Sequence, residues 1–173
     1  ALGGMRDIQG IVHETSLLDP EEGIRFRNYT IEQCQKLLPK APNGHEPLPE
    51  GLFWLLVTGE IPTEKQVQFV SEDWIRRLVH NPLPSILIET IKKLPKEMHP
   101  MTQLSISVMM LQHRSTFAKA YHSGTVGKDR YWEFLFEDIN DIIAVLPSIA
   151  SLIYCNKTGK CAAAIPKHVS DWA

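Results

Sequence analysis

The sequence lacks a strong excess of charge of either sign. Its 173 residues include 18 lysine and arginine residues against 20 aspartate and glutamate residues, so the formal net charge at pH 7 is −2. Proteins that bind nucleic acid or anionic membrane surfaces concentrate basic residues and carry a positive field. We therefore expect no nucleic-acid partner, and an anionic ligand must be bound by a few local side chains.

Cysteine is scarce, and the histidines show no metal-binding pattern. The three cysteines, Cys34, Cys155 and Cys161, are an odd number at spacings that fit neither a disulfide framework nor a zinc site. None of the seven histidines belongs to a His-Glu-x-x-His pattern. The sequence predicts free thiols, a reducing compartment and no metal site.

No apolar run is long enough to cross a bilayer. The most apolar stretch, residues 142–155, contains Pro147 and has only about two-thirds of the ~20 residues that a spanning helix needs. The chain also opens without an arginine-rich amphipathic segment or a signal-type apolar segment. We expect no membrane span and no targeting peptide in this chain.

What is present predicts a mainly α-helical fold with a short N-terminal β-hairpin. Residues 11–16 are rich in β-branched side chains, and residues 24–27 alternate apolar with basic side chains. Between them, residues 19–23 read Asp-Pro-Glu-Glu-Gly, a composition typical of turns. We expect these two segments to pair as the strands of the hairpin.

Six helices are predicted after the hairpin. Thr30 with Gln33, and Thr63 with Gln66, form capping boxes, while prolines and Gly59 mark other helix ends. The predicted helices cover residues 30–38, 49–59, 63–81, 85–94, 100–111 and about 131–154, the last kinked or interrupted at Pro147. The predicted organisation is a hairpin segment at 1–29, helices at 30–155 and a connecting tail at 156–173.

Two of these helices are unusually apolar. Residues 52–57 are apolar on every side, so we expect that helix to be enclosed by other helices or by a partner subunit. The helix that begins at Pro100 carries a wide apolar stripe, which is also expected to be buried. The stripe consists of Met101, Leu104, Val108, Met110 and Leu111.

One loop has the composition of an anion site. Residues 124–130 place Lys128 and Arg130 beside two glycines, whose exposed amides can approach an anion closely. The loop does not match a phosphate loop, because Asp129 stands where a hydroxyl is required. A solvated connection with incidental charge is the equally weighted alternative.

Two further features favour structural roles over catalytic ones. His99 precedes Pro100 at a helix start and is predicted to cap it, because no partner for acid–base catalysis is visible in the sequence. Glu133, Glu137 and Asp141 share one helical face. A solvated face is the favoured interpretation of these acids, and a metal or acid–base cluster is the alternative.

Motifs in family order make the chain similar to the N-terminal portion of mitochondrial-type citrate synthases. The matching segments include residues 3–6 (Gly-Gly-Met-Arg), 18–27, 47–59, 60–64, 99–105 (His-Pro-Met-Thr-Gln-Leu-Ser), 117–121 (Phe-Ala-Lys-Ala-Tyr) and 131–133 (Tyr-Trp-Glu). The resemblance implies part of a large helical domain, a homodimer, a mitochondrial matrix location, and condensation of acetyl-coenzyme A with oxaloacetate to citrate.

The resemblance carries two binding residues onto this sequence. Arg6 matches a family arginine that contacts the phosphates of coenzyme A, and a guanidinium suits phosphate because it donates two parallel hydrogen bonds. A second phosphate-binding arginine of the family falls at Lys128, which keeps the charge but loses the planar geometry. Coenzyme A is thus expected as part of a substrate, and no permanently bound cofactor is expected.

The family's catalytic histidines and aspartate have no counterpart in this chain, which ends shortly after a family Asp-Trp pair at 171–172. We therefore expect the chain alone to be inactive and to be a fragment of a citrate synthase. The alternative is a truncated, non-catalytic relative that acts as a helical scaffold or assembly subunit. A third hypothesis keeps the family but changes the acyl thioester, whose selecting side chains lie outside this sequence.

Overall fold

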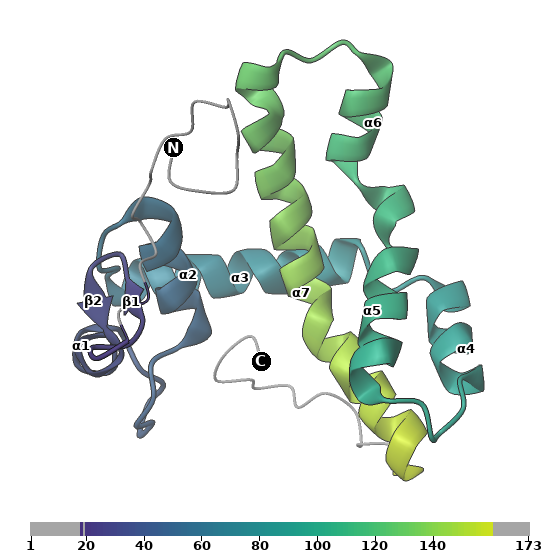
Figure 1. Cartoon of the computed structure of the whole chain (residues 1–173), viewed down its shortest axis with the longest axis horizontal. Coiled ribbons are helices and arrows are strands. Elements are labelled where there is room, and N and C mark those ends of the chain that lie inside the picture. Colours follow the sequence, from purple (N-terminus) through teal and green to yellow (C-terminus); the bar gives the residue numbers. More distant parts are fainter. Residues whose placement is uncertain (1–17, 19, 161–173) are drawn as a thin grey trace. The chain divides into compact units, whose positions relative to one another are not determined.

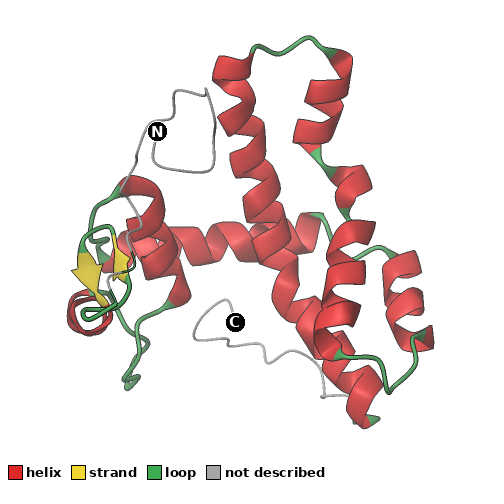
Figure 2. Cartoon of the chain, in the orientation of Figure 1, coloured by secondary structure: helices red, strands yellow, loops and turns green. Residues whose placement is uncertain are grey.

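The structure is a computed structural model of the chain and describes residues 18 and 20–160. Within these residues it contains seven α-helices, two short strands and two 3-10 helices, so the predicted mainly α-helical class is confirmed (Figures 1 and 2). The elements are β1 Arg25–Phe26, β2 Tyr29–Thr30, α1 Ile31–Leu37, α2 Pro49–Thr58, α3 Glu64–His80, α4 Ser85–Lys93, α5 Pro100–Met110, η1 Gln112–Arg114, α6 Thr116–Ser123, η2 Lys128–Arg130 and α7 Tyr131–Thr158.

The chain divides into two compact units, residues 1–70 and residues 71–173. The described core of the first unit is a small cluster of Cys34, Leu38 and Leu55. Four partly buried apolar residues pack against this cluster: Phe26, Tyr29, Leu52 and Ile61. Burial raises the pKa of the Cys34 thiol, which favours the unreactive protonated form. Cys34 and Cys155 are both free, as predicted.

The observed hairpin differs from the predicted one. Arg25 pairs with Thr30 and Phe26 with Tyr29, so the strand partner follows residues 24–27 in the chain. The two turn residues, Arg27 and Asn28, have φ values of 48° and 74°, and positive φ at both central positions is what a tight two-residue hairpin requires. The predicted partner strand, residues 11–16, lies outside the described residues.

Helix ends in the first unit follow the predicted signals. Thr30 and Gln33 form a reciprocal capping box on α1, and the side-chain oxygen of Gln66 accepts a hydrogen bond from the Thr63 amide at 2.8 Å before α3. Helix α2 begins at Pro49 and ends at Gly59, which has a φ of 82°. Such a left-handed position suits glycine because other residues suffer contact between Cβ and the main chain.

In the single chain, the described residues enclose only part of α2, and its predicted enclosure by a partner subunit stays a prediction. Leu55 is fully buried, whereas Leu56 and Val57 are 42% and 48% exposed. A ten-residue helix packed against one small cluster buries only one face, so the opposite face of this all-apolar sequence is exposed in the single chain. The carbonyl oxygen of Leu56 accepts a hydrogen bond from Arg27 Nε at 2.8 Å.

The second unit is built around α7. Helices α4, α5 and α6 all pack against it, and in Figure 1 α6 and α5 follow one side of α7 while α4 lies beyond α5. Its core cluster consists of Leu87, Ile91, Leu111, Val145, Ile149 and Ile153. On α5, however, the fully buried residues are the polar Gln103 and Ser107, while Met101 of the predicted apolar stripe is 59% exposed.

Helix α7 is longer than predicted. It continues through Pro147 without interruption and ends at Gly159, so residues 156–158 of the predicted tail are helical. Proline removes one main-chain hydrogen bond from the helix, but burial of Val145 and Ile149 on either side keeps this segment packed. The side-chain amide of Asn156 donates to the Leu94 carbonyl at 3.2 Å and ties down the last turn.

Residues 128–158, which comprise η2 and α7, form the one helical segment in the described part of the chain that is long and apolar enough to cross a membrane. Length and composition alone are weak evidence for a span, because core helices of globular proteins share them. Val145, Ile149 and Ile153 belong to the core cluster with α4 and α5 residues. The apolar character of α7 is therefore explained in part by its position at the centre of this unit.

Candidate functional site

The candidate anion site lies at the connection between α6 and α7. Helix α6, which was not predicted, ends at Gly124 with a φ of 63°. The Ser123 and Thr125 hydroxyls are hydrogen-bonded at 2.7 Å, and the 3-10 helix η2 then leads into α7 (Figure 1). The predicted basic loop is therefore partly helical, and it forms the end of a helical hairpin.

Lys128 and Arg130 are both exposed on this connection, but their surroundings differ. Arg130 donates from Nε to Glu133 Oε1 at 3.2 Å and from Nη2 to Glu133 Oε2 at 2.7 Å. These hydrogen bonds raise the pKa of Arg130 and lower the pKa of Glu133. Lys128 takes part in none of the ion pairs found among the described residues. Arg6, the other predicted phosphate-binding residue, lies outside the described residues.

Aromatic rings hold the connection in place. The ring of Tyr131, the first residue of α7, meets the ring of Phe117 edge-on at a centroid distance of 5.3 Å. Tyr121 lies 6.0 Å from both rings. Edge-to-face contacts of this kind add to the stabilisation that comes from burial. The rings therefore fix the end of α6 against the start of α7, next to Lys128.

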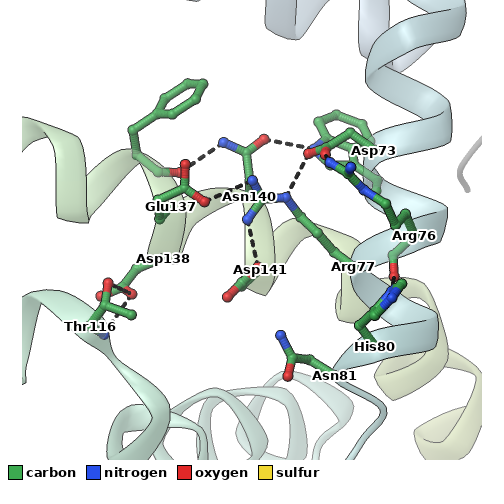
Figure 3. A network of polar contacts seen from close by, with 12 residues as sticks. Asp73, Arg76, Arg77, His80, Asn81, Thr116, Glu137, Asp138, Asn140 and Asp141 are labelled. Carbon is green, nitrogen blue, oxygen red and sulfur yellow. Dashed lines mark hydrogen bonds and ion pairs between the residues drawn. The ribbon is translucent and has the colours of Figure 1, made fainter.

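Asp138 of α7 holds the other end of α6. One carboxylate oxygen accepts hydrogen bonds from the Thr116 amide at 2.8 Å and the Thr116 hydroxyl at 2.7 Å. The other accepts from the Ser115 hydroxyl at 2.6 Å and the Phe117 amide at 3.1 Å. Figure 3 shows Asp138 and Thr116 facing each other across the two helices. The carboxylate of Asp138 thus lies at the N-terminus of α6, where the helix dipole favours a negative charge.

The predicted face of three acids is engaged in ion pairs. Arg77 of α3 donates to Asp141 at 2.7 Å and to Glu137 at 2.8 Å, and its Nε donates to Asp73 at 2.6 Å (Figure 3). Glu133, the third acid, pairs with Arg130 instead. Within the described residues, no group of three acidic, histidine or cysteine side chains has the arrangement of a metal site. The acid face of α7 therefore serves to hold α3 and η2.

The pKa values in this cluster follow from its contacts. Burial lowers the pKa of Arg77, but its hydrogen bonds with Asp73, Asp141 and Glu137 outweigh burial, so the pKa is raised overall. Burial raises the pKa of Asp73, and hydrogen bonds from Arg77 and Arg76 more than reverse this effect. Both side chains are therefore firmly charged near neutral pH.

Three of the histidines that the structure describes contact main-chain groups. His99 Nδ1 accepts a hydrogen bond from the Met101 amide at 3.2 Å, so its predicted role as a helix cap is confirmed. His80 Nδ1 lies 2.7 Å from the Arg76 carbonyl, and His113 Nδ1 lies 2.8 Å from the Met110 carbonyl. None of these three contacts joins a histidine to a carboxylate.

The multi-helical fold agrees with that of a solved enzyme. A crystal structure of citrate synthase from Pyrobaculum aerophilum matches 93% of this chain with a TM-score of 0.67, over 37% of its own length and at 19% sequence identity. At that identity the match shows the fold alone. The class of protein is thus a helical domain with the architecture found in part of a citrate synthase.

Sequence similarity identifies the family directly. The family described as "Citrate synthase, C-terminal domain" matches residues 4–173. The chain is 54% identical over 173 residues to the mitochondrial citrate synthase of Kajikia audax and 53% identical to that of Xiphias gladius. Each match covers 99% of this chain and 36% of the relative. The chain belongs to the citrate synthase family and spans about a third of the length of these relatives.

Proposed function

We propose that this chain is the N-terminal part of a citrate synthase whose complete protein condenses acetyl-coenzyme A with oxaloacetate and water to give citrate and coenzyme A. The observation that carries the proposal is the 54% identity, sustained over 173 residues, to a protein named as a mitochondrial citrate synthase. The relatives' names support a mitochondrial location for the complete protein, and the matrix is the compartment proposed from the family resemblance.

In this proposal the chain contributes binding and framework but no catalytic group. Condensation needs a base that removes a proton from the acetyl methyl group and donors that stabilise the enolate oxygen. By the family resemblance, the two acid–base histidines and the catalytic aspartate that supply these groups have no counterpart in this chain. We therefore expect no condensation by the 173-residue chain alone.

Arg6 and Lys128 are the residues proposed to contact the phosphates of the coenzyme A thioester. Support for Lys128 comes from its exposure at the end of a helical hairpin, which is fixed by the rings of Phe117, Tyr121 and Tyr131. A cation on a fixed support loses less conformational freedom when it binds an anion than one on a mobile loop. Support for Arg6 is the family motif alone.

A homodimer is the proposed assembly. Apolar side chains on α4 and α5 are exposed in the single chain: Ile86 is 61% exposed, Met101 59% and Met109 75%. Exposed apolar side chains are common at interaction sites in proteins. The exposure of these three side chains supports a subunit contact through α4 and α5.

A second candidate function is a non-catalytic scaffold or assembly subunit. It is favoured by one observation, the exposure of Trp132, Leu135 and Ile139 on α7 at 65%, 41% and 47%. Such a protein would bind another polypeptide on this face and would need no catalytic region. The two candidates differ in the reading frame beyond Ala173, because only the enzyme requires the catalytic region that by the family resemblance follows this portion.

The experiment that tests the proposal combines sequencing with an assay. The transcript is read beyond Ala173, and the complete polypeptide is assayed for release of the free thiol of coenzyme A in the presence of oxaloacetate. Acetyl-coenzyme A and propionyl-coenzyme A are compared to define the acyl preference. We expect an open reading frame and faster release with the acetyl thioester. An immediate stop codon after residue 173 would contradict the proposal.

A further inference from the structure

The contact between Arg130 and Glu133 has the geometry that a phosphate would require. Nε and Nη2 of Arg130 each donate to a different carboxylate oxygen of Glu133, at 3.2 Å and 2.7 Å. Guanidinium groups bind phosphate in the same way, with two parallel hydrogen bonds to two oxygens. The carboxylate of Glu133 thus occupies the place that two oxygens of a phosphate would take.

Lys128 alone does not supply this geometry. An ammonium group acts on a phosphate as a point charge and lacks the planar pair of donors. Arg130 stands two residues further along the same 3-10 helix, so the two Cα atoms are about 6 Å apart, although the two side chains leave the helix about 120° apart. Both side chains are exposed and longer than this separation, so they are free to turn towards one phosphate. A planar donor pair is therefore available next to Lys128, provided that Arg130 leaves Glu133.

Breaking the ion pair between Arg130 and Glu133 requires little free energy. The side chains of Arg130 and Glu133 are 61% and 40% exposed, so water can solvate both after they separate. Ion pairs in such surroundings contribute little to stability because solvent screens them. Glu133 also remains in the first turn of α7, where the helix favours a negative charge with or without Arg130.

Two carboxylates counter the two cations at this connection. Asp129 lies between Lys128 and Arg130, and its carboxylate folds back onto Gly127. Glu133 pairs with Arg130 at 2.7 Å. A phosphate must therefore compete with Glu133 for Arg130, and removal of that carboxylate should strengthen binding of the phosphate.

We propose that Arg130 exchanges its ion pair with Glu133 for a phosphate of the coenzyme A thioester and thereby completes the contact that Lys128 begins. This inference rests on the proposed function of the complete enzyme. Arg130 is then a residue that sets affinity for the phosphate-bearing part of the substrate. Glu133 is the group that competes with that phosphate.

The test uses steady-state kinetics of the complete enzyme with two substrates. Acetyl-coenzyme A carries phosphates, whereas acetyl-pantetheine carries none. Arg130→Gln should raise KM for acetyl-coenzyme A about two- to fivefold, which is the range that exposed ion pairs span, while kcat and kcat/KM for acetyl-pantetheine stay unchanged. Arg130→Lys should restore part of the loss, because it keeps the charge without the planar donors.

A double-mutant comparison isolates the competition. Glu133→Gln should lower KM for acetyl-coenzyme A about twofold, and most of this gain should disappear in the Arg130→Gln background. Asp129→Asn is the matched control, since it removes one negative charge from the same connection and leaves the Arg130–Glu133 pair intact. Asp129 acts on Arg130 by charge as the smallest contribution to its raised pKa, so the effect of Asp129→Asn should depend on the background much less than that of Glu133→Gln.

The outcomes separate this inference from the proposed function. If the wild-type enzyme forms citrate but Arg130→Gln leaves KM for acetyl-coenzyme A unchanged, the inference is wrong and the function stands. The same holds if Glu133→Gln lowers KM equally with and without Arg130, because the effect is then one of general charge. If the wild-type enzyme forms no citrate, both are overturned.

Discussion

Replacement of Asp138 by alanine should loosen α6 without unfolding the first unit. The carboxylate accepts four hydrogen bonds from Ser115, Thr116 and Phe117, two of them from main-chain amides in the first turn of α6. Those amides have no partner within the helix. The change therefore removes the group that satisfies the start of α6 and joins it to α7.

The size of the effect depends on the number and exposure of these bonds. A hydrogen bond to a charged group contributes about 1.5–3 kcal/mol when water cannot replace it. Asp138 lines an open cavity with a volume of about 1000 Å³, so water can reach the freed donors and the hydroxyls can turn towards it. Counting about 1 kcal/mol for each amide and a smaller amount for the hydroxyls gives about 2–3 kcal/mol.

Hydrogen exchange of main-chain amides measures this loss where it occurs. A change of about 2–3 kcal/mol should speed exchange of the α6 amides by about 30- to 150-fold if they exchange through local opening. Amides of α2, which lies in the first unit, should keep their rates. Glu137→Gln is the matched control, because it neutralises the adjacent carboxylate and leaves α6 untouched. Exchange in α6 within twofold of wild type for Asp138→Ala would refute the reasoning.

The same carboxylate makes α6 sensitive to acid. Burial raises the pKa of Asp138, but its hydrogen bonds from Ser115, Thr116 and Phe117 outweigh burial and lower it in the folded state. The stabilisation is therefore complete above the ordinary carboxyl pKa of about 4 and is lost as the pH falls towards the lowered value. Protection of the α6 amides should decline over this range in the wild-type protein and should vary less in Asp138→Ala.

Three further substitutions test other contacts. Arg77→Met should destabilise the second unit by about 2 kcal/mol, because it leaves three carboxylates without their shared cation; urea unfolding would measure it, and a loss below about 0.5 kcal/mol would contradict the cluster's importance. Trp74→Phe should cost about 3 kcal/mol, since it removes buried volume and the 2.8 Å hydrogen bond to Asn140; a shift in the thermal midpoint reports it, and an unchanged midpoint would argue against this contact. His99→Ala should cost about 1 kcal/mol while His99→Asn should cost almost nothing, because asparagine keeps a cap acceptor; equal losses for both variants would show that the ring matters for another reason.

Local signals in the sequence predicted much of the helical framework. The capping box at Thr30 and Gln33, the proline at position 49 and the glycine at position 59 act within one turn of a helix, and each marks the expected end. His99 was recognised as a cap for the same reason. These predictions succeed because a helix end is stabilised by residues close by in the chain.

Long-range contacts explain what the sequence did not reveal. Helix α6 has only eight residues and depends on Asp138, which is 22 residues away from Thr116. Helix α7 passes through Pro147 because neighbouring residues are buried against other helices. The buried polar residues Gln103 and Asn140 have partners distant in sequence, so periodicity could not identify them as core.

At the candidate site, too, the sequence predicted the residues but not their contacts. The family motif pointed to Lys128, and composition pointed to Arg130 as a second cation on the connection. The pairing of Arg130 with Glu133 needed the helical geometry of η2 and the first turn of α7. A spacing of three residues is a possible signal for such a pair, but it becomes specific only once the intervening residues are known to be helical.

Conversion of labelled substrate tests the central claim most directly. The complete polypeptide that carries this sequence is incubated with oxaloacetate and acetyl-coenzyme A labelled with carbon-13 in the acetyl group, and the products are monitored by NMR. We predict labelled citrate from the complete protein and none from residues 1–173 alone. Labelled citrate from the 173-residue chain, or none from an intact and folded complete protein, would contradict the account.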